Sequence, residues 1–243
     1  MTSATQGPGE LAGASSPEAL HYYSLLPEPG QAEGLVVEEF LFAADHTTVG
    51  LAGAGWTAGG GWWSSAAFIR GMRTDPRLRA RIAAVRRHEA EDVYRRLGGG
   101  ELPDETALRT YFRDHDVLPG SAPLLLSAPQ APDGFRERRL YRVLFANELG
   151  EDRLARLRDV WRMAAPGDSA DPRARVVGTA RLRLASDVFT WDLRRIGPGV
   201  AWCLDVTAYL NSPSGGALGP LLRELTTVMR HEGLIPVTIE RFS

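Results

Sequence analysis

The pair Asp45 and His46 is the first place in this chain where side chains suit proton transfer. An imidazole titrates near neutral pH, and a neighbouring carboxylate can orient it as an acid–base group. Glu38 and Glu39 lie a few residues upstream, and a loop rich in glycine and tryptophan follows. The same residues fit an ordinary turn, because an aspartate side chain accepts hydrogen bonds from the backbone of its own turn. A catalytic histidine and a plain turn are therefore the two interpretations of this segment.

His115 is the second acid–base candidate, because it stands between Asp114 and Asp116. The three groups are adjacent in sequence, whereas a helical zinc pair such as H-E-x-x-H places its histidines one turn apart. Cys203 is the only cysteine of the chain, which excludes an intrachain disulfide and a metal site built on paired thiolates. We therefore predict no metal, and we expect Cys203 to be a buried thiol within a strand.

Arg181, Arg183 and Arg194 are the candidates for holding an anion. Alternate residues of a strand share one face, so arginines that alternate with apolar residues can converge into a receptor for sulfate, phosphate or carboxylate. The alternative is a solvated sheet face on which the arginines meet acidic residues of the helices. The alternating set over three expected strands comprises Arg136, Arg138, Arg139, Arg142, Arg181, Arg183, Arg194 and Arg195.

Trp56, Trp62 and Trp63 form an aromatic group within a segment that holds six glycines between residues 50 and 63. Large rings beside a permissive backbone suit an adaptable apolar wall against a substrate. The same rings also suit a core or a subunit interface. Both interpretations stay open from the sequence alone.

Composition removes several reaction classes. All 28 basic residues are arginine, so a lysine Schiff base and the lysine of a nucleotide-binding phosphate loop are both excluded. The net charge is -2 and no basic block occurs, which argues against nucleic acid as a partner. The sequence shows no signal-peptide pattern and no apolar run long enough to span a bilayer. We expect a cytoplasmic protein that does not bind membranes.

The elements that position these residues divide into two lobes. We expect residues 1–33 to be mostly disordered apart from a short helix that begins at 16–18 and includes 20–23. Residues 34–116 should form a smaller lobe with strands at 35–43 and 47–56. A long helix should open at 74–76, because Leu78, Ile82, Val85, Val93 and Leu97 recur at helical spacing. A proline-rich connector is expected over 117–134.

Residues 135–243 show the clearer pattern. Strands and helices alternate in the order β-α-β-β-β-α-β, with one helix at 149–164 and a second that aligns leucines over 218–229. This order predicts an α+β fold with a largely antiparallel sheet and helices packed on one of its faces.

The order of elements in the C-terminal lobe, which ends in the segment LDVTAYLNSPSGGALGPLLRELTTVMRHEGLIPVTIE, resembles the GCN5-related acyltransferases. The resemblance covers most of that lobe. The resemblance implies that amides of Gly215, Gly216 and Ala217, at a helix N-terminus, hold the pyrophosphate of coenzyme A. Ser212 and Pro213 stand where that family has a basic or glutamine residue. A strand, a glycine-rich turn and an amphipathic helix of an unrelated α+β protein would give the same pattern.

Three functions follow as hypotheses. The first is a cofactor-independent biosynthetic enzyme of bacterial secondary metabolism, which would cyclise, eliminate or isomerise a small intermediate by acid–base catalysis. Its substrate would be free or tethered to an acyl or amino-group carrier protein, and arginines would bind its anionic group. The second is an acyltransferase that uses coenzyme A. The third is a noncatalytic partner that stabilises another enzyme. Among partners, a homodimer and a heterodimer both stay open.

Overall fold

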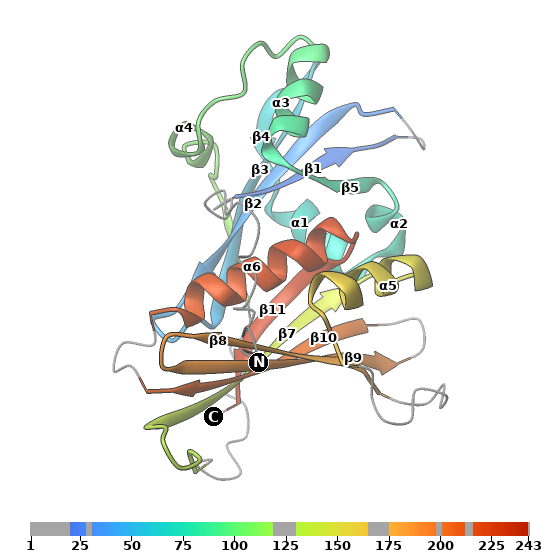
Figure 1. Ribbon diagram of the computed structural model, residues 1–243. Coiled ribbons are helices and arrows are strands. Elements are labelled where there is room, and N and C mark those ends of the chain that lie inside the picture. Colours follow the sequence, from blue (N-terminus) through green and yellow to red (C-terminus); the bar gives the residue numbers. More distant parts are fainter. Residues whose placement is uncertain are drawn as a thin grey trace, which may run out of the picture.

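Two antiparallel sheets, one from each half of the chain, form the computed structural model (Figure 1). The structure describes residues 20–27, 31–118, 130–164, 175–197, 201–211 and 216–242. We call 20–118 the first lobe and 130–242 the second lobe. Helices and antiparallel strands occur in both, so the fold is α+β, as the sequence pattern predicts. In the described part of the chain, no helix has both the length and the apolar character to cross a lipid bilayer.

The first sheet has the strand order β4-β3-β2-β1-β5, and β6 pairs with the other half of the outer edge of β3. A long hairpin of β2 and β3 forms its centre. The strands are β1 (His21–Leu25), β2 (Gly34–Phe42), β3 (Thr48–Thr57), β4 (Gly61–Ser64), β5 (Ile82–Val85) and β6 (His115–Val117). The helices are α1 (Ala66–Thr74), α2 (Pro76–Arg79), α3 (Arg87–Arg96) and α4 (Glu105–Arg109).

The second sheet has the order β11-β7-β10-β9-β8, with every neighbouring pair antiparallel. Its chain order is the predicted β-α-β-β-β-α-β. The strands are β7 (Glu137–Ala146), β8 (Val176–Leu184), β9 (Asp187–Gly197), β10 (Ala201–Leu210) and β11 (Ile235–Arg241). The helices are α5 (Glu151–Val160) and α6 (Leu218–His231).

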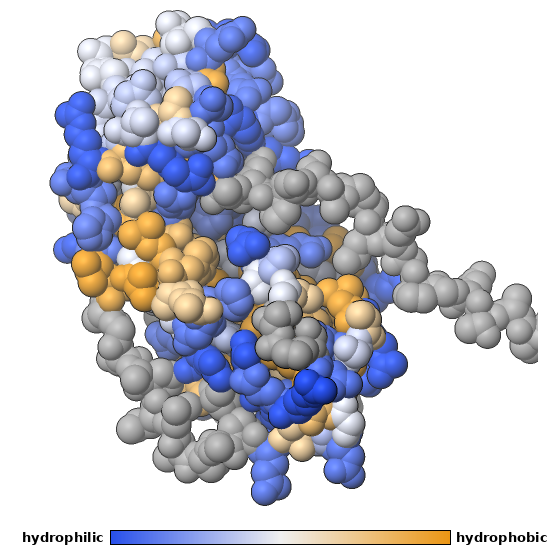
Figure 2. Space-filling model, turned by 90° about the vertical axis from the view of Figure 1, so that its left-hand side faces the viewer, coloured by the Kyte–Doolittle hydropathy of each residue, from blue (hydrophilic) through white to orange (hydrophobic). Residues whose placement is uncertain are grey.

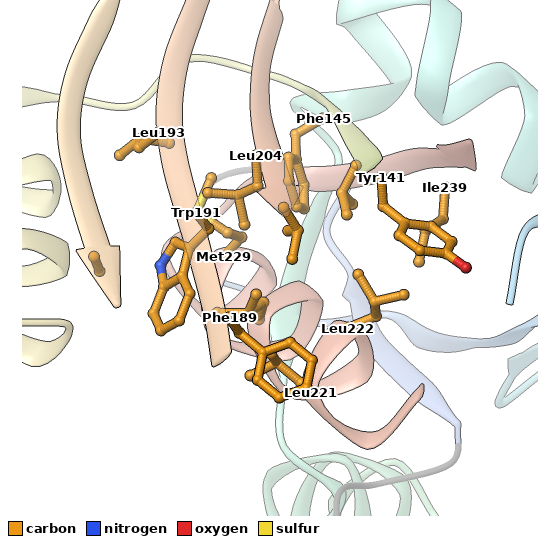
Figure 3. Packing of buried hydrophobic residues seen from close by; sticks show 14 of the residues in the cluster. Tyr141, Phe145, Phe189, Trp191, Leu193, Leu204, Leu221, Leu222, Met229 and Ile239 are labelled. Atoms are coloured by element: carbon orange, nitrogen blue, oxygen red, sulfur yellow. The ribbon is translucent and has the colours of Figure 1, made fainter. Parts of the chain in front are cut away.

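One face of the second sheet packs against α5 and α6. Figure 3 shows Phe145, Phe189 and Trp191 on the strands packed with Leu222 and Met229 of α6, and leucines of α5 complete the same cluster. Burial of each such side chain contributes about 1.5–3 kcal/mol. Because side chains alternate along a strand, the residues between these core positions face away from the helices. The polar side chains of the second sheet therefore collect on the face opposite α5 and α6.

Two buried arginines link the lobes, one donating from the first lobe to the second and the other from the second lobe to the first. Arg73 of α1 donates from Nε to the backbone oxygen of Pro236 in β11, at 2.9 Å. Arg230 of α6 is fully buried and donates from Nη1 to the backbone oxygen of Tyr22 in β1, also at 2.9 Å. Thr48 adds a third link, since its Oγ1 accepts from the backbone N–H of Ile239 at 3.0 Å. Polar contacts therefore fix how the two sheets sit against each other.

Two expectations about the first lobe are wrong. Residues 20–23, expected in a helix, lie at and within strand β1, which is central in its sheet because it pairs with both β2 and β5. The long helix expected from 74–76 is instead α2, β5 and α3, because 82–85 pairs with β1. The apolar residues of these three short elements are spaced, by coincidence, as they would be along one helix. Residues 1–19, and 119–129 of the expected connector, lie outside the described residues.

Candidate functional site

A pocket of about 380 Å³ on the second lobe gathers arginine side chains. We call it the arginine pocket. It lies on the sheet face opposite α5 and α6, because two of its arginines alternate with core residues on β7 and β9. Its lining residues are Arg142, Arg175, Arg194, Arg195, Ile196 and Cys203.

Strand register explains this convergence. Arg142 of β7 lies directly opposite Asp205 of β10, and Arg194 of β9 lies opposite Cys203. Asp205 and Cys203 are two residues apart and so share a face. Residues distant in sequence meet here because β10 is central and pairs with β7 on one side and β9 on the other.

Asp205 is held between two guanidinium groups. Arg142 donates from Nε and Nη2 to its two oxygens, at 2.6 and 2.9 Å, and Arg194 donates from Nη1 at 3.2 Å. The hydrogen bond and charge of Asp205 raise the pKa of Arg142, so this arginine stays charged. The Nε of Arg194 is buried and has no hydrogen-bond partner among the described residues. A bound oxygen atom would satisfy that donor.

Charge is nearly balanced on the pocket face of the sheet. Arg142 and Arg194 lie among three carboxylates: Asp205, Glu240 opposite Arg142 on β11, and Asp192 opposite Asp205 on β9. Arg195 is opposite Trp202, and its Cζ lies 5.0 Å from the centroid of that core ring, so its guanidinium is on the helix face of the sheet. The capacity of the pocket for an anion therefore rests on Arg142, Arg175 and Arg194.

Cys203 lies at the wall of this pocket but is unsuited to nucleophilic attack. Burial and the charge of Asp205 raise the pKa of its thiol to about 11. The thiol is therefore protonated at neutral pH, and the reactive form of cysteine is the thiolate. The arrangement offers hydrogen-bond donors to an anion but no reactive thiolate.

The structure places Asp45 and His46 in the turn between β2 and β3. Asp45 Oδ1 accepts from the backbone N–H and the hydroxyl of Thr47, at 3.1 and 2.7 Å. His46 has a positive φ of 70°, and its ring lies against Gly219 in the first turn of α6. Burial, together with the charges of two arginines, lowers the pKa of His46. The carboxylate thus orders the turn, because its hydrogen bonds are with Thr47 and not with the imidazole of His46.

His115 lies apart from His46 on the exposed strand β6, opposite Ala52. Its neighbours are occupied: Asp116 is buried and pairs with Arg70, and Asp114 accepts from the hydroxyl of Ser64. Across the residues that the structure describes, His, Cys, Asp and Glu side chains form no group that could hold a metal ion. The structure therefore does not bring the predicted acid–base residues together.

The three tryptophans pack within the first lobe. Trp62 stacks on Tyr111 with ring centroids 4.8 Å apart, and Trp56 lies 4.4 Å from Tyr94. Trp63 covers Gly55, where a Cβ would meet its ring at 2.1 Å. β4 pairs with β3, so the glycine-rich segment is a hairpin. Trp56 is a core residue, whereas Trp62 and Trp63 are only partly buried, and none of the three lines the arginine pocket.

Among the predicted anion-binding residues, only Arg194 lines the arginine pocket. Arg181 and Arg183 are exposed on the edge strand β8. The other lining arginines were missed as site residues, although Arg142 and Arg195 belong to the alternating set. Only the strand register would have identified them as site residues. That β10 pairs with both β7 and β9 cannot be inferred from the sequence of any one of these strands.

A buried cluster of His21, Tyr23, Glu38 and Arg73 was also missed by sequence reasoning. Arg73 donates from Nη2 and Nη1 to the two oxygens of Glu38, at 2.7 and 2.9 Å, and the hydroxyl of Tyr23 donates at 3.1 Å. His21 Nδ1 lies 3.7 Å from the same carboxylate. Burial alone would raise the pKa of Glu38, but Arg73 and these hydrogen bonds lower it to about 2. Every charge here is matched within the protein.

Comparisons of the chain with protein-family models, with curated proteins and with solved structures find no match. The site is therefore argued from its own geometry. Of the residues that the acyltransferase resemblance implies, Gly215 lies outside the described residues. Gly216 and Ala217 directly precede α6, and Ala217 is its N-cap.

Proposed function

We propose that the protein binds a small molecule in the arginine pocket through a carboxylate, phosphate or sulfate group. The observation that carries the proposal is the convergence of Arg142, Arg175 and Arg194 on one pocket of about 380 Å³. The planar guanidinium matches two oxygens of such groups at once, and charge-assisted hydrogen bonds are stronger than neutral ones. The unpartnered Nε of Arg194 supports the same conclusion.

The bound anion would be the part of a substrate that the protein recognises. In this proposal the protein is a cytoplasmic, cofactor-independent enzyme of secondary metabolism that cyclises, eliminates or isomerises an intermediate, free or on the phosphopantetheine arm of a carrier protein. Cys203 stays protonated and Asp205 is paired with two arginines. The reacting part of such a substrate would therefore extend beyond the arginine pocket, with the arginines holding its anionic end.

A noncatalytic partner is the second candidate, because one surface is unusually apolar. Phe42 and Val117 are 40% and 69% exposed, and they share a face where β2, β3 and β6 meet, because they are opposite Thr48 and Gly50 of β3. Val49, between Thr48 and Gly50, is 45% exposed on the other face. Figure 2 looks at the side on which the β2–β3 hairpin ends and shows hydrophobic residues gathered there. Contiguous apolar patches of this kind mark protein interfaces. Copurification that Val117→Asp abolishes, with the fold intact, would favour this function.

Calorimetric titration with inorganic phosphate, sulfate and citrate tests the anion site. The ionic strength is held constant, because exposed charges are screened over about 8 Å at physiological salt. The variant Arg175→Ala removes a lining arginine that does not hold Asp205. Each lost charge-assisted bond is worth about 1.5–3 kcal/mol, so we expect the Kd of the best ligand to rise at least tenfold.

The matched control is Arg183→Ala, which removes the same charge from the exposed edge of the same sheet. We expect this variant to bind like the wild type. Equal weakening by both variants would show that net charge, and not the arginine pocket, attracts the anion. Acetyl-coenzyme A belongs in the same ligand panel: stabilisation that survives loss of Arg175 would point to the acyltransferase alternative instead.

A further inference from the structure

A second and larger pocket, of about 740 Å³, lies between the two lobes. We call it the interlobe pocket. One wall comes from β5 and the end of α2, and the other comes from the turn between α6 and β11 together with residues of the second lobe that pack beside it. Pockets at the junction of two lobes are the usual place for small-molecule sites. The polar side chains that line it are Tyr23, Arg79, Asn147, Arg153 and His231.

The arginine of each wall is anchored by a backbone carbonyl. Arg79 of α2 donates from Nη1 to the backbone oxygen of Arg73, at 2.8 Å. Arg153 of α5 donates from Nη1 to the backbone oxygen of Glu232, also at 2.8 Å. A guanidinium has five N–H donors, so one anchoring bond fixes its position and leaves donors for a ligand. The two walls thus supply one positioned cation each.

The second wall adds two neutral donors. Asn147 donates from Nδ2 to the backbone oxygen of Gly233, at 2.9 Å, which places its amide beside Arg153 at the same turn. Arg230 Nη2 lies 3.3 Å from His231 Nε2. Arginine only donates, so Nε2 accepts and the ring proton of His231 resides on Nδ1. Burial and the charges of Arg230 and Arg86 lower the pKa of His231 to about 4, which keeps the ring neutral at pH 7.

Acidic side chains are absent from the described residues that line the interlobe pocket. The adjacent Glu232 is engaged by Arg156, whose Nη2 lies 2.8 Å from its Oε2. The pocket therefore offers two cations and a neutral imidazole with no carboxylate to compete. A neutral imidazole that donates a hydrogen bond suits a carbonyl or other uncharged oxygen, whereas guanidinium groups suit an oxyanion.

We propose that the interlobe pocket is a second binding site, for a small carboxylate that also carries a carbonyl oxygen, such as a 2-oxo acid. Arg79 and Arg153 bind the carboxylate from opposite walls, and His231 donates to the carbonyl. This site shares no lining residue with the arginine pocket. A ligand here contacts both lobes, so its binding also stabilises their arrangement.

Pyruvate and propionate form the matched probe pair, because they differ in the carbonyl. We expect pyruvate to bind more tightly in titrations followed by amide chemical shifts. Arg79→Ala should weaken pyruvate about tenfold or more. Arg77→Ala, on the same helix and exposed, should leave its affinity unchanged. His231→Phe should reduce the affinity for pyruvate to that for propionate without changing the latter.

Three outcomes would overturn the inference: no pyruvate binding, equal loss in the Arg77 and Arg79 variants, or His231→Phe weakening both ligands alike. The Arg175→Ala variant separates this site from the arginine pocket. If it abolishes pyruvate binding while Arg79→Ala does not, then only the arginine pocket binds carboxylates. Far-ultraviolet circular dichroism confirms that each variant is folded, and Arg153→Gln repeats the test from the second wall.

Discussion

Glu38–Arg73 and Asp205–Arg142 are both carboxylate–guanidinium ion pairs, but they differ in their surroundings and in their roles. Glu38 is fully buried and Arg73 almost so, and further hydrogen bonds from Tyr23 and to Pro236 complete that pair. Asp205 is surrounded by more arginines than it can neutralise, at the edge of an open pocket. Burial and complete pairing, and not the presence of an ion pair, separate a structural link from a candidate binding site.

Removing the carboxylate of the buried cluster should have the largest effect on stability. Glu38→Gln leaves Arg73 buried without its counterion, and breaking a buried ion pair costs about 3–5 kcal/mol. The measurement is the free energy of unfolding in urea at pH 7. The control is Glu39→Gln, since Glu39 is the next residue and pairs with the partly exposed Arg109. A loss below 1 kcal/mol for Glu38→Gln would contradict the role of this cluster in holding the lobes together.

We expect acid to lower the free energy of unfolding in two pH windows, one set by Glu38 and the other by His231. The loss in the His231 window should be nearly as large as the loss in the Glu38 window. The folded-state pKa of Glu38, about 2, is below its ordinary value of 4.5, so its contribution is complete above pH 4.5 and is lost as the pH falls toward 2. The shift corresponds to about 3 kcal/mol. The pKa of His231, about 4, is likewise lowered, so its contribution is lost between pH 6.5 and 4.

Free energies of unfolding at pH 7, 5.5, 4 and 3 check both windows. His231→Gln should flatten the dependence between pH 6.5 and 4, and Glu38→Gln should flatten it below pH 4.5. If both variants keep the slope of the wild type, other groups carry the acid sensitivity.

The second lobe could be predicted from sequence better than the first. Its strands and helices alternate in long elements, and the apolar residues of the fourteen-residue helix α6 recur at helical spacing from Leu218 to Met229. In the first lobe, α2 and β5 have four residues each, too few for any period to be visible. Tertiary pairing with β1 decided the structure there.

Prediction of the site followed the same division. Arg194 could be proposed from sequence because alternation along one strand is a local pattern. Arg175 lies outside that pattern, and the register of β9 on β10 depends on contacts between distant segments. Adjacency in sequence suggested a contact between Asp45 and His46, but Asp45 instead orders the turn. The histidine that does lie beside a carboxylate is His21, whose partner Glu38 is on the neighbouring strand. Local spacing therefore identifies which faces residues share, and pairing decides which residues meet.

Asp205→Asn is the smallest and sharpest test of the difference between the two regions. The ion pairs of Asp205 are partly exposed, so its loss should cost only about 1 kcal/mol of unfolding free energy. The same change removes the carboxylate that competes with a ligand for Arg142 and Arg194, so phosphate or sulfate should bind the arginine pocket more tightly than in the wild type. Calorimetry gives the affinity and urea unfolding gives the stability. Weaker anion binding with unchanged stability would mean that Asp205 orients these arginines toward a ligand rather than competing with it, whereas strong destabilisation would make the arginine pocket a second structural link like the Glu38 cluster.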